Sequence, residues 1–462
     1  MLGQQDLEAR DAGPARAHER SSGAAAAAPA APVEPSSGAA LVPGAQARAR
    51  ARAAVDAVRR HPMASILALA LLVRWVAALA VGSSFRFVDE TEYVDAARRL
   101  VAGQGFESDY EKEPGYAILL GMLMSPLPRD LLFLRLAHGV LSALGCSLVY
   151  FVGRRIFGQV AAVFAALCYA LDPLSVIAAV LLYPEAVAAM ALLGTVLAAL
   201  NAVRGNRLAW SAAAGALLGV LIQFRAVGLV LPPILMAWVA IVLRGTPMRR
   251  RLLHAVTIGA MCGLVLVPWT YRNYQVHGHL VPVSLSGASN APVRWRSEAR
   301  GSGLATSTLH RISDDPAAFV QRTLQQFGYF WELSPSRLLT DDPQWREGAH
   351  ERDERLPTDP TFSPSLRDRV SALSFGFELV VALLGVLVAA RRRPRETALL
   401  LALVLAYALG FSLFFAKLRY RIAVLPEVFL FTGVGLATIW QAAARMGIEP
   451  NEHAVVRRES HS

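Results

Sequence analysis

The stretch MASILALALLVRWVAALAVG, residues 63–82, is apolar along almost its whole length. An α-helix needs about 20 such residues to cross the hydrocarbon core of a bilayer. Further apolar stretches follow at 115–128, 131–153, 159–175, 180–203, 208–224, 226–243, 252–269, 371–390, 397–415 and 422–443. Backbone polar groups in lipid must be paired within their own segment, so these stretches are expected to be helices. The sequence predicts an all-α polytopic membrane protein with about 10–11 transmembrane helices.

The composition agrees with a membrane protein. Of the 462 residues, 54% are hydrophobic, and the mean hydropathy of +0.39 is too high for a soluble globular protein. The net charge of +11 comes from arginines clustered between apolar stretches, a pattern that sets membrane topology, so no nucleic-acid partner is expected. The three cysteines lie inside apolar stretches without C-x-x-C spacing, which argues against a disulfide framework and a cysteine metal site.

The arginine clusters also orient the chain. Those expected on the cytoplasmic side are Arg59/Arg60, Arg154/Arg155, Arg204/Arg207, Arg244 with Arg249–Arg251, and Arg391–Arg393 with Arg395. They agree only if the chain crosses once, net, between 115 and 153. The short stretch 115–128 is therefore expected to be re-entrant or to lie on the surface, which leaves about ten true crossings and cytoplasmic termini in the plasma (inner) membrane.

Composition divides the chain into five parts. Residues 1–60 are rich in Ala, Pro, Arg and Ser and are expected to form a disordered cytoplasmic tail, without a cleaved signal peptide. An N-terminal transmembrane module follows at 61–269, with a first extracytoplasmic loop at 83–114. The polar insertion 270–370 is expected to be a small extracytoplasmic subdomain. The C-terminal transmembrane helices then occupy 371–443, before a second cytoplasmic tail at 444–462.

Two adjacent carboxylates, Asp89 and Glu90, stand directly behind the first apolar stretch. Neighbouring residues on a helical turn point about 100° apart, so one acid could accept a proton while the other orients a ligand or a metal. The alternative is that both acids simply cap the helix expected at 89–100. The residues alone favour the two interpretations equally.

Charged residues also mark the ends of other apolar stretches. In Lys112-Glu113-Pro114-Gly115-Tyr116, the lysine either supports a phosphate or extends to the interface as a flanking residue. Glu185, in Tyr183-Pro184-Glu185, and Arg225 each interrupt apolar sequence. Such residues are candidates for a functional site, although a paired interfacial charge is an equal alternative.

The segment PWTYRNYQVHGHLVPVS, residues 268–284, is predicted to end a helix and continue as an extended, strand-like run. Arg272 and Asn273, just outside the bilayer, could meet a lipid phosphate, or the aromatic residues around them could form an interfacial belt. His277 and His279 alternate as in a strand, and no third ligand has metal-site spacing, so both are expected to be structural.

Three cations within five residues, Lys417, Arg419 and Arg421, precede the last apolar stretch and flank Tyr420. Such a cluster on the outer face would clamp a phosphate or pyrophosphate. The alternative is that this corner lies on the cytoplasmic side, where basic residues are ordinary.

Taken in order, these four motifs resemble the polytopic glycosyltransferases of the GT-C type over residues 63–443. Within that group the chain is similar to bacterial relatives of the dolichyl-phosphate-mannose protein mannosyltransferases and of the aminoarabinose transferases for lipid A. The resemblance implies inverting transfer of one sugar from a polyprenyl-phosphate-linked donor to an extracytoplasmic acceptor. Two departures are visible. The family often has Lys-Pro-Pro where this chain has Lys112-Glu113-Pro114, and its Thr/Ser-Asp/Glu pair appears here as Tyr183-Pro184-Glu185.

The resemblance makes Asp89 the catalytic base, with Glu90 supporting it. Lys112, Arg272, Arg419 and Arg421 would hold the donor phosphate, and the outward-facing cations Arg225 and Lys417 join this expected group. The residues expected to bind substrate are Tyr93, Glu113, Tyr116, Glu185, Asn273 and Tyr420. A divalent metal would fit beside Asp89 and Glu90, but the sequence shows no set of metal ligands.

Two other functions are alternatives to a glycosyltransferase. A secondary transporter or flippase of a lipid-linked or anionic substrate would need ionisable residues near the bilayer midplane and repeated halves, and no repeat is evident. A membrane scaffold that binds a partner through 270–370 would tolerate alanine at all the charges named above.

Overall fold

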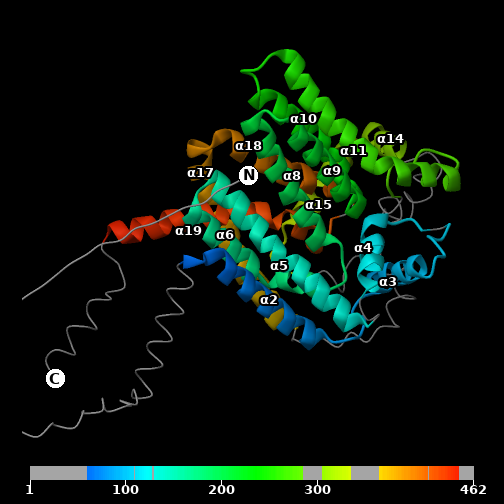
Figure 1. Cartoon of the computed structure of the whole chain (residues 1–462), viewed down its shortest axis with the longest axis horizontal. Helices are drawn as coiled ribbons and strands as arrows, with labels where there is room; N and C mark the ends of the chain where they lie inside the picture. Colours follow the sequence, from blue (N-terminus) through cyan, green and yellow to red (C-terminus); the bar gives the residue numbers. More distant parts are fainter. Residues whose placement is uncertain are drawn as a thin grey trace, which may run out of the picture. The chain divides into compact units, whose positions relative to one another are not determined.

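The computed structural model describes residues 60–108, 110–126, 130–284, 304–334, 364–414 and 416–446. Residues 1–59 and 447–462 of the expected tails, and the insertion residues 285–303 and 335–363, lie outside these ranges. All regular elements in the described part are helical (Figure 1). In chain order they are α2 (Pro62–Val81), α3 (Val88–Val101), α4 (Pro114–Met124), α5 (Leu131–Ile156), α6 (Gln159–Leu171), α7 (Pro173–Val180), α8 (Glu185–Gly205), α9 (Leu208–Phe224), the 3₁₀ helix η1 (Ala226–Val230), α10 (Leu231–Val242), α11 (Met248–His277), α14 (Leu304–Asp314), α15 (Pro316–Phe330), α17 (Pro364–Arg392), α18 (Pro394–Ser412), the 3₁₀ helix η3 (Leu418–Val424) and α19 (Leu425–Arg445).

The predicted fold class is confirmed, since every predicted apolar stretch overlaps one or two described helices. Seven helices are long and apolar enough to cross a membrane, and the bent pair α6–α7 raises the number to eight. The predicted ten or eleven spans are reached only when the shorter apolar helices α4, α9 and η1–α10 are counted as well. With 11 residues, α4 is about 16 Å long, roughly half the thickness of the hydrocarbon core.

The bend between α6 and α7 is 56° and lies at Asp172-Pro173. Proline disfavours helical geometry in the residue before it, and the carboxylate of Asp172 caps the new helix by accepting the Ser175 N–H at 2.7 Å. The last carbonyls of α6 are left without helical partners. Arg74, fully buried within α2, donates to two of them, Tyr169 and Ala170, at 3.1 Å each.

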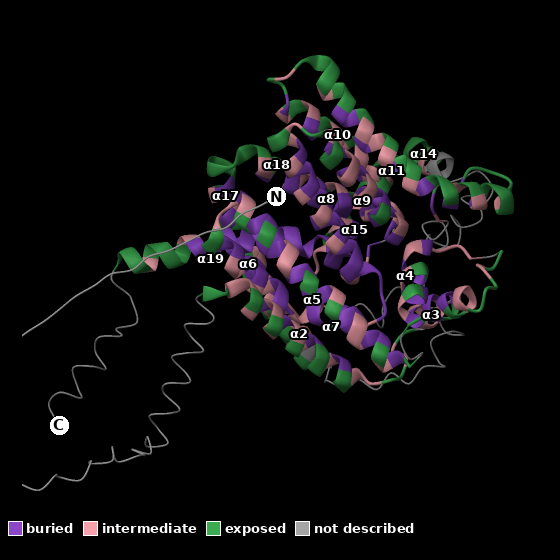
Figure 2. Cartoon of the chain, viewed as in Figure 1, coloured by how far each residue is buried: buried purple, intermediate pink, exposed green. Residues whose placement is uncertain are grey.

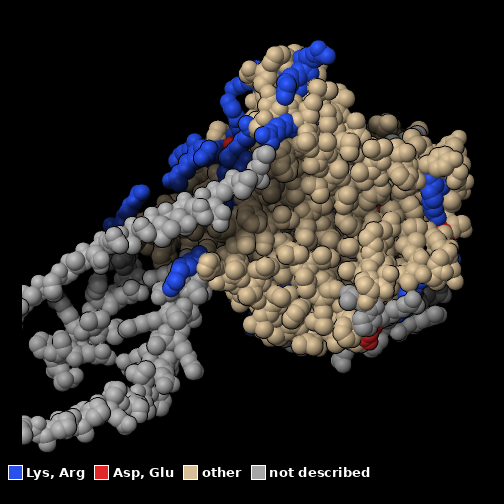
Figure 3. Space-filling view, in the orientation of Figure 1, with Lys and Arg blue, Asp and Glu red and all other residues tan. Residues whose placement is uncertain are grey.

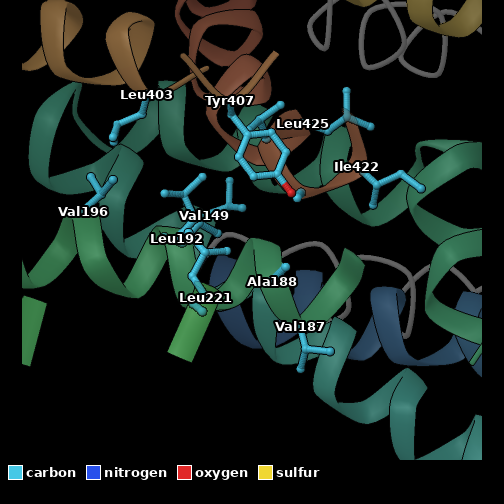
Figure 4. Close-up of a cluster of buried hydrophobic side chains, with 14 of the residues drawn as sticks. Val149, Val187, Ala188, Leu192, Val196, Leu221, Leu403, Tyr407, Ile422 and Leu425 are labelled. Carbon is cyan, nitrogen blue, oxygen red and sulfur yellow. The ribbon is translucent and has the colours of Figure 1, made fainter. Parts of the chain in front are cut away.

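The helices pack around α8 and α19, the most buried of the candidate spans, whereas α2 turns most of its surface outward (Figure 2). Side chains from α5, α8, α9, α18, η3 and α19 meet in one apolar cluster (Figure 4). On the outer surface, Lys and Arg gather along one edge of the face drawn in Figure 3, and its broad middle carries almost no charge. An uncharged band with basic residues beyond it is what a membrane-spanning bundle requires.

Small residues let α17 and α19 approach closely. A Cβ atom added at Gly385 would overlap the carbonyl oxygen of Phe431, and one added at Gly435 would overlap that of Val381. Each helix therefore places a glycine against the backbone of the other. Since apolar side chains gain little by leaving lipid for protein, this close van der Waals packing is a main source of helix association in membranes.

The segment 268–284 ends a helix as predicted, but later than the predicted apolar stretch 252–269, because α11 continues to His277 with Pro268 inside it. Proline is tolerated in membrane helices where neighbouring groups satisfy the freed backbone. The chain turns back only at Gly278, whose φ of 71° is the left-handed conformation that glycine adopts readily. His277 is thus the last helical residue, and the expected alternation with His279 in a strand is absent.

Two described helices of the predicted insertion, α14 and α15, precede the C-terminal spans. α15 packs on α18, where the buried Phe330 stacks on Phe411 with ring centroids 6.3 Å apart. Its Gln326 side chain also accepts the backbone N–H of Ala416 at 2.9 Å. This part of the insertion therefore rests directly on the membrane helices, next to η3.

Candidate active site at the helix ends

Asp89, in the first turn of α3, lies between two cations from distant parts of the chain. Its carboxylate is 3.0 Å from Lys112 Nζ and 2.5 Å from Arg419 Nη2. Burial alone would raise the pKa of Asp89, but the charges of Arg419, Lys112 and Lys417 hold it well below its usual range. Asp89 is nevertheless 32% exposed, so a ligand can reach it. The structure thus brings the start of α3, in the first loop, into contact with η3, which directly precedes α19.

Lys112 connects Asp89 to the aromatic wall of the site. Its ammonium group is 2.6 Å from Glu92 Oε2 and 4.7 Å from the centroid of the Tyr93 ring. Burial alone would lower the pKa of Lys112, but Tyr93, Asp89 and Glu92 raise it above its usual value. The lysine therefore stays charged, which is what a phosphate ligand requires.

Arg419 is the central cation of the group. Besides Asp89, its Nε lies 3.6 Å from Glu185 Oε1, and its guanidinium stands 4.5 Å from the Tyr183 ring centroid and 5.3 Å from that of Tyr420. The planar guanidinium can stack on aromatic rings while its edge donates hydrogen bonds. Its contacts with Asp89 and Glu185 join the two acidic motifs into one site.

A second ion pair lies deeper. Glu185, the first residue of α8, is buried and accepts a hydrogen bond from Arg225, which stands between α9 and η1. The Arg225 guanidinium is also 5.1 Å from the Tyr420 ring. In the described structure Glu185 Oε2 and Arg225 Nε have no hydrogen-bond partner. Both residues thus retain polar atoms that a ligand or water could satisfy.

Glu90 has a different environment from Asp89. It is fully buried and accepts hydrogen bonds from Arg135 at 2.7 Å, from Leu182 N–H at 2.9 Å and from Arg86 N–H at 2.7 Å. The N–H of the N-cap residue Phe87 also donates to Glu90 Oε2 at 3.4 Å, so this side chain caps the start of α3. The two interpretations of the acidic pair therefore divide between its members: Glu90 caps and anchors the helix, and Asp89 faces the cations.

Arg135 was not singled out from the sequence, yet it is fully buried beside Glu90. Besides that carboxylate, it donates to the carbonyls of Gly82, Ser84 and Val180. Its guanidinium thus ties the first loop to α5 and to the end of α7. The available signal was an arginine inside the apolar stretch 131–153, because an intramembrane charge usually has a specific partner.

Two other predicted substrate residues, Glu113 and Tyr116, support the site from behind. Glu113 is buried, and its Oε1 accepts the Ala226 N–H at 3.1 Å and the Ser284 hydroxyl at 3.2 Å. Tyr116 packs edge-on against Tyr93, with ring centroids 5.1 Å apart. These contacts fix the Lys112 loop against η1 and α3.

Arg272 and Asn273 lie against the far end of the first loop. Arg272 donates to the Glu107 carbonyl and stands 4.7 Å from the Trp269 ring centroid. The Asn273 amide donates to the carbonyls of Val281 at 3.2 Å and Val283 at 3.0 Å. In the described structure neither side chain contacts Asp89. Both instead hold the first loop and the 278–284 turn against α11.

Arg421 also points away from Asp89. It is fully buried, donates to the Glu332 carbonyl, and lies 3.7 Å from the Phe375 ring centroid. The predicted clamp of Arg419 and Arg421 is therefore divided between two places. In the described part of the chain, no three His, Cys, Asp or Glu side chains come together as metal ligands.

Comparison with known proteins agrees with this architecture. Residues 114–271 match the family described as dolichyl-phosphate-mannose-protein mannosyltransferase. Among solved structures, ArnT from Cupriavidus metallidurans bound to undecaprenyl phosphate superposes with a TM-score of 0.55 at 19% identity, covering 82% of this chain and 60% of that one. The apo oligosaccharyltransferase of Archaeoglobus fulgidus gives 0.54 at 15% identity, covering 83% and 51%.

The archaeal oligosaccharyltransferase AglB from A. fulgidus, in complex with an inhibitory peptide and a dolichol-phosphate, gives a TM-score of 0.53 at 13% identity, with 85% and 52% covered. The chain thus spans about half to three fifths of these structures. No protein with a curated description matches it in sequence. The chain has the GT-C-type membrane fold of these transferases and, over residues 114–271, resembles the dolichyl-phosphate-mannose-protein mannosyltransferases.

Proposed function

We propose that this protein is a membrane glycosyltransferase that moves a sugar from a polyprenyl-phosphate-linked donor to an acceptor on the extracytoplasmic face, with inversion. One observation carries the proposal: the Asp89 carboxylate lies between Lys112 and Arg419, beside the ends of membrane helices. A carboxylate base next to fixed cations is what transfer from a lipid phosphate requires. A donor held in the bilayer can reach such a site laterally.

The structural neighbours support a lipid-phosphate donor. ArnT was solved with undecaprenyl phosphate, and AglB with a dolichol-phosphate. Both ligands join a prenyl chain to an anionic phosphate. Lys112 and Arg419 supply the positive charge that such a phosphate would need here, and Arg225 adds a third cation behind them.

The proposed reaction is a single displacement. Asp89 accepts the proton of an acceptor hydroxyl while the acceptor oxygen forms a bond to the anomeric carbon of the sugar. The bond between that carbon and the phosphate oxygen breaks, and its electrons leave with the polyprenyl phosphate. Lys112 and Arg419 stabilise the charge that develops on this leaving group. Because attack and departure occur on opposite faces, the anomeric configuration inverts.

The observed ion pairs also give an order to this reaction. With both cations on its carboxylate, Asp89 has a strongly lowered pKa and is a poor base. A donor phosphate would take Lys112 and Arg419 as partners, and the proton affinity of Asp89 would then rise. The donor therefore binds before Asp89 becomes an effective base.

The remaining predicted residues take supporting roles in this proposal. Arg225 and Glu185 hold Arg419 in place, and Tyr93 and Tyr420 line the site. Lys417 adds to the positive field at Asp89. Glu113, Tyr116, Arg272, Asn273 and Arg421 position the loops around the site.

The direct test uses purified full-length protein in lipid nanodiscs and a panel of polyprenyl-phosphate sugars, with release of polyprenyl phosphate as the readout. Turnover of at least one donor is expected. The same protein in vesicles tests the transporter and flippase alternative. Movement of an intact donor across the membrane, without cleavage of its sugar–phosphate bond in either assay, would overturn the proposal.

A further inference from the structure

A second cationic site lies at the opposite end of the helices that carry the candidate active site. A shallow cavity of about 360 Å³, open to the surface, is lined by Arg155, Asn201, Arg204, Gly205, Arg207 and Trp210, and the last four of these residues are exposed. It has three guanidinium groups and no acidic residue in its lining. The reaction proposed above uses none of these residues, so the site needs a separate explanation.

The helix α8 gives the distance between the two sites. Its first residue, Glu185, belongs to the Asp89 group, and its last turn carries Arg204 and Gly205 in the cavity. The 21 residues of α8 span about 30 Å, which matches the thickness of the hydrocarbon core. The cavity and the Asp89 group therefore open towards opposite membrane surfaces.

The charges in the cavity are not neutralised by the protein. Arg204 donates to the backbone carbonyl of Arg155 at 3.0 Å, which brings two like charges together. Arg155 Nε is buried and has no hydrogen-bond partner in the described structure. In that part of the chain, no carboxylate forms an ion pair with Arg155, Arg204 or Arg207. An anion in the cavity would relieve this repulsion.

Two further features favour an anion. The helix α9 begins at Leu208, and its N-cap residue Arg207 makes no side-chain cap, so the positive end of the helix dipole faces this region. Trp210, in the first turn, is 42% exposed. Half-exposed tryptophan side chains are enriched at the headgroup level of membranes.

We propose that this cavity binds the phosphate headgroup of an anionic lipid, in the leaflet opposite the Asp89 group. Arginine pockets between transmembrane helices on the cytoplasmic side recognise anionic headgroups. Topological bias alone explains why arginines occur at this surface, but it does not require three of them to share one cavity with a buried, unpartnered Nε. The inference is independent of the proposed transferase activity.

The test is native mass spectrometry of the purified full-length chain with phosphatidylglycerol or phosphatidylcholine. Wild-type protein is expected to retain phosphatidylglycerol preferentially. The R155Q/R204Q variant should lose about 25-fold in affinity, about fivefold for each arginine that contacts the bound headgroup. The control R391Q/R392Q removes two exposed arginines from the end of α17 and should bind like wild type.

Two further controls separate loss of charge from damage to the fold, and binding of a lipid from binding of a free anion. R155K/R204K keeps both charges and should retain much of the preference, which separates loss of charge from damage to the fold. Inorganic phosphate at millimolar concentration distinguishes a lipid headgroup from a free anion and should leave the bound lipid in place. The proposal fails if R155Q/R204Q and R391Q/R392Q bind equally, if the two lipids bind equally, or if inorganic phosphate alone occupies the site and displaces the lipid.

Discussion

Glu90 and Arg135, 45 positions apart, form a fully buried ion pair that fastens the Asp89-bearing helix to α5. Breaking such a pair by removing one partner leaves an uncompensated charge and costs about 3–5 kcal/mol. E90Q and R135Q should therefore each lower the unfolding temperature strongly in detergent. The R135Q/E90Q variant should lower the unfolding temperature by less than the sum of the two single effects, because it contains no isolated charge. Additive losses would contradict an energetic coupling between these residues.

Asp89 and Glu92 offer a matched pair for the catalytic assignment, since both carboxylates contact Lys112 but only Asp89 contacts Arg419. D89N should reduce the rate of transfer by about 10²–10⁴-fold, the usual contribution of a general base. E92Q should change it only a few-fold. Rates are measured per folded molecule, at a temperature where size-exclusion chromatography and thermal unfolding show wild type and both variants to be folded. Wild-type activity in D89N would remove Asp89 as the base.

Arg419 and Arg421 provide a second pair of matched variants. Both arginines belong to η3, but Arg419 contacts Asp89 whereas Arg421 contacts the Glu332 carbonyl. R419Q removes a donor to the proposed leaving group and should lower kcat/KM for the lipid-linked donor by about 10²–10³-fold. R421Q should mainly lower thermal stability, because its side chain is buried against Phe375 and the Glu332 carbonyl. Equal kinetic losses in the two variants would show that Arg421 also takes part in donor binding.

The pH dependence of stability tests the ion pairs around Asp89. The neighbouring cations lower the pKa of Asp89 in the folded protein. Its contribution to the free energy of unfolding is therefore fully present above the pKa of the unfolded chain, about 3.9, and is lost only as pH falls through the lower pKa of the folded state. The pKa of Lys112 is raised in the folded protein. Its contribution to the free energy of unfolding is therefore fully present below the pKa of the unfolded chain, about 10.4, and is lost as pH rises through the higher pKa of the folded state. The difference in unfolding temperature between wild type and D89N should therefore stay constant from about pH 5 to 9.

The control for this experiment is D95N, which breaks the exposed Asp95–Arg98 pair on the same helix. Exposed pairs contribute little, so D95N should unfold within about a degree of wild type throughout. A wild-type-to-D89N difference that changes steeply between pH 5 and 9 would mean that Lys112 and Arg419 do not hold Asp89 ionised.

Asn273 provides a test of the loop architecture. Its amide donates to two carbonyls of the 278–284 turn, and an apolar replacement would leave both without this donor. N273L should cost about 1–3 kcal/mol, measured as a lower unfolding temperature and faster proteolysis near residue 280. H279A, on an exposed residue of the same turn, should leave both measurements unchanged.

The sequence was sufficient for much of this organisation. The length of the apolar stretches predicted the helices, and charges at their ends marked Asp89, Lys112, Glu185, Arg225 and Arg419, which the structure brings together. Such charges stand out because an ionisable side chain beside lipid needs a partner. The residues alone could not separate the acid that caps α3 from the acid that faces the cations, because the environments of Asp89 and Glu90 depend on contacts made by distant parts of the chain.

The separation of Arg419 from Arg421 could not be predicted. Residues two apart lie on the same side of an extended chain, but in a 3₁₀ helix, with three residues per turn, they point to different faces. The conformation of 418–424 depends on tertiary packing that its sequence does not reveal. Likewise, aromatic and polar residues after Pro268 suggested the end of a helix, whereas contacts with the 278–284 turn keep α11 helical to His277.

The paired glycines Gly385 and Gly435 have a consequence that reaches beyond helix packing. They determine how near α19 stands to α17, and α19 begins directly after η3, which carries Arg419. A single methyl group at either glycine would wedge the two helices apart and shift the guanidinium relative to Asp89. Alanine at 385 or 435 should therefore impair catalysis, although neither glycine belongs to the Asp89 site, because the displaced α19 would move η3 with it.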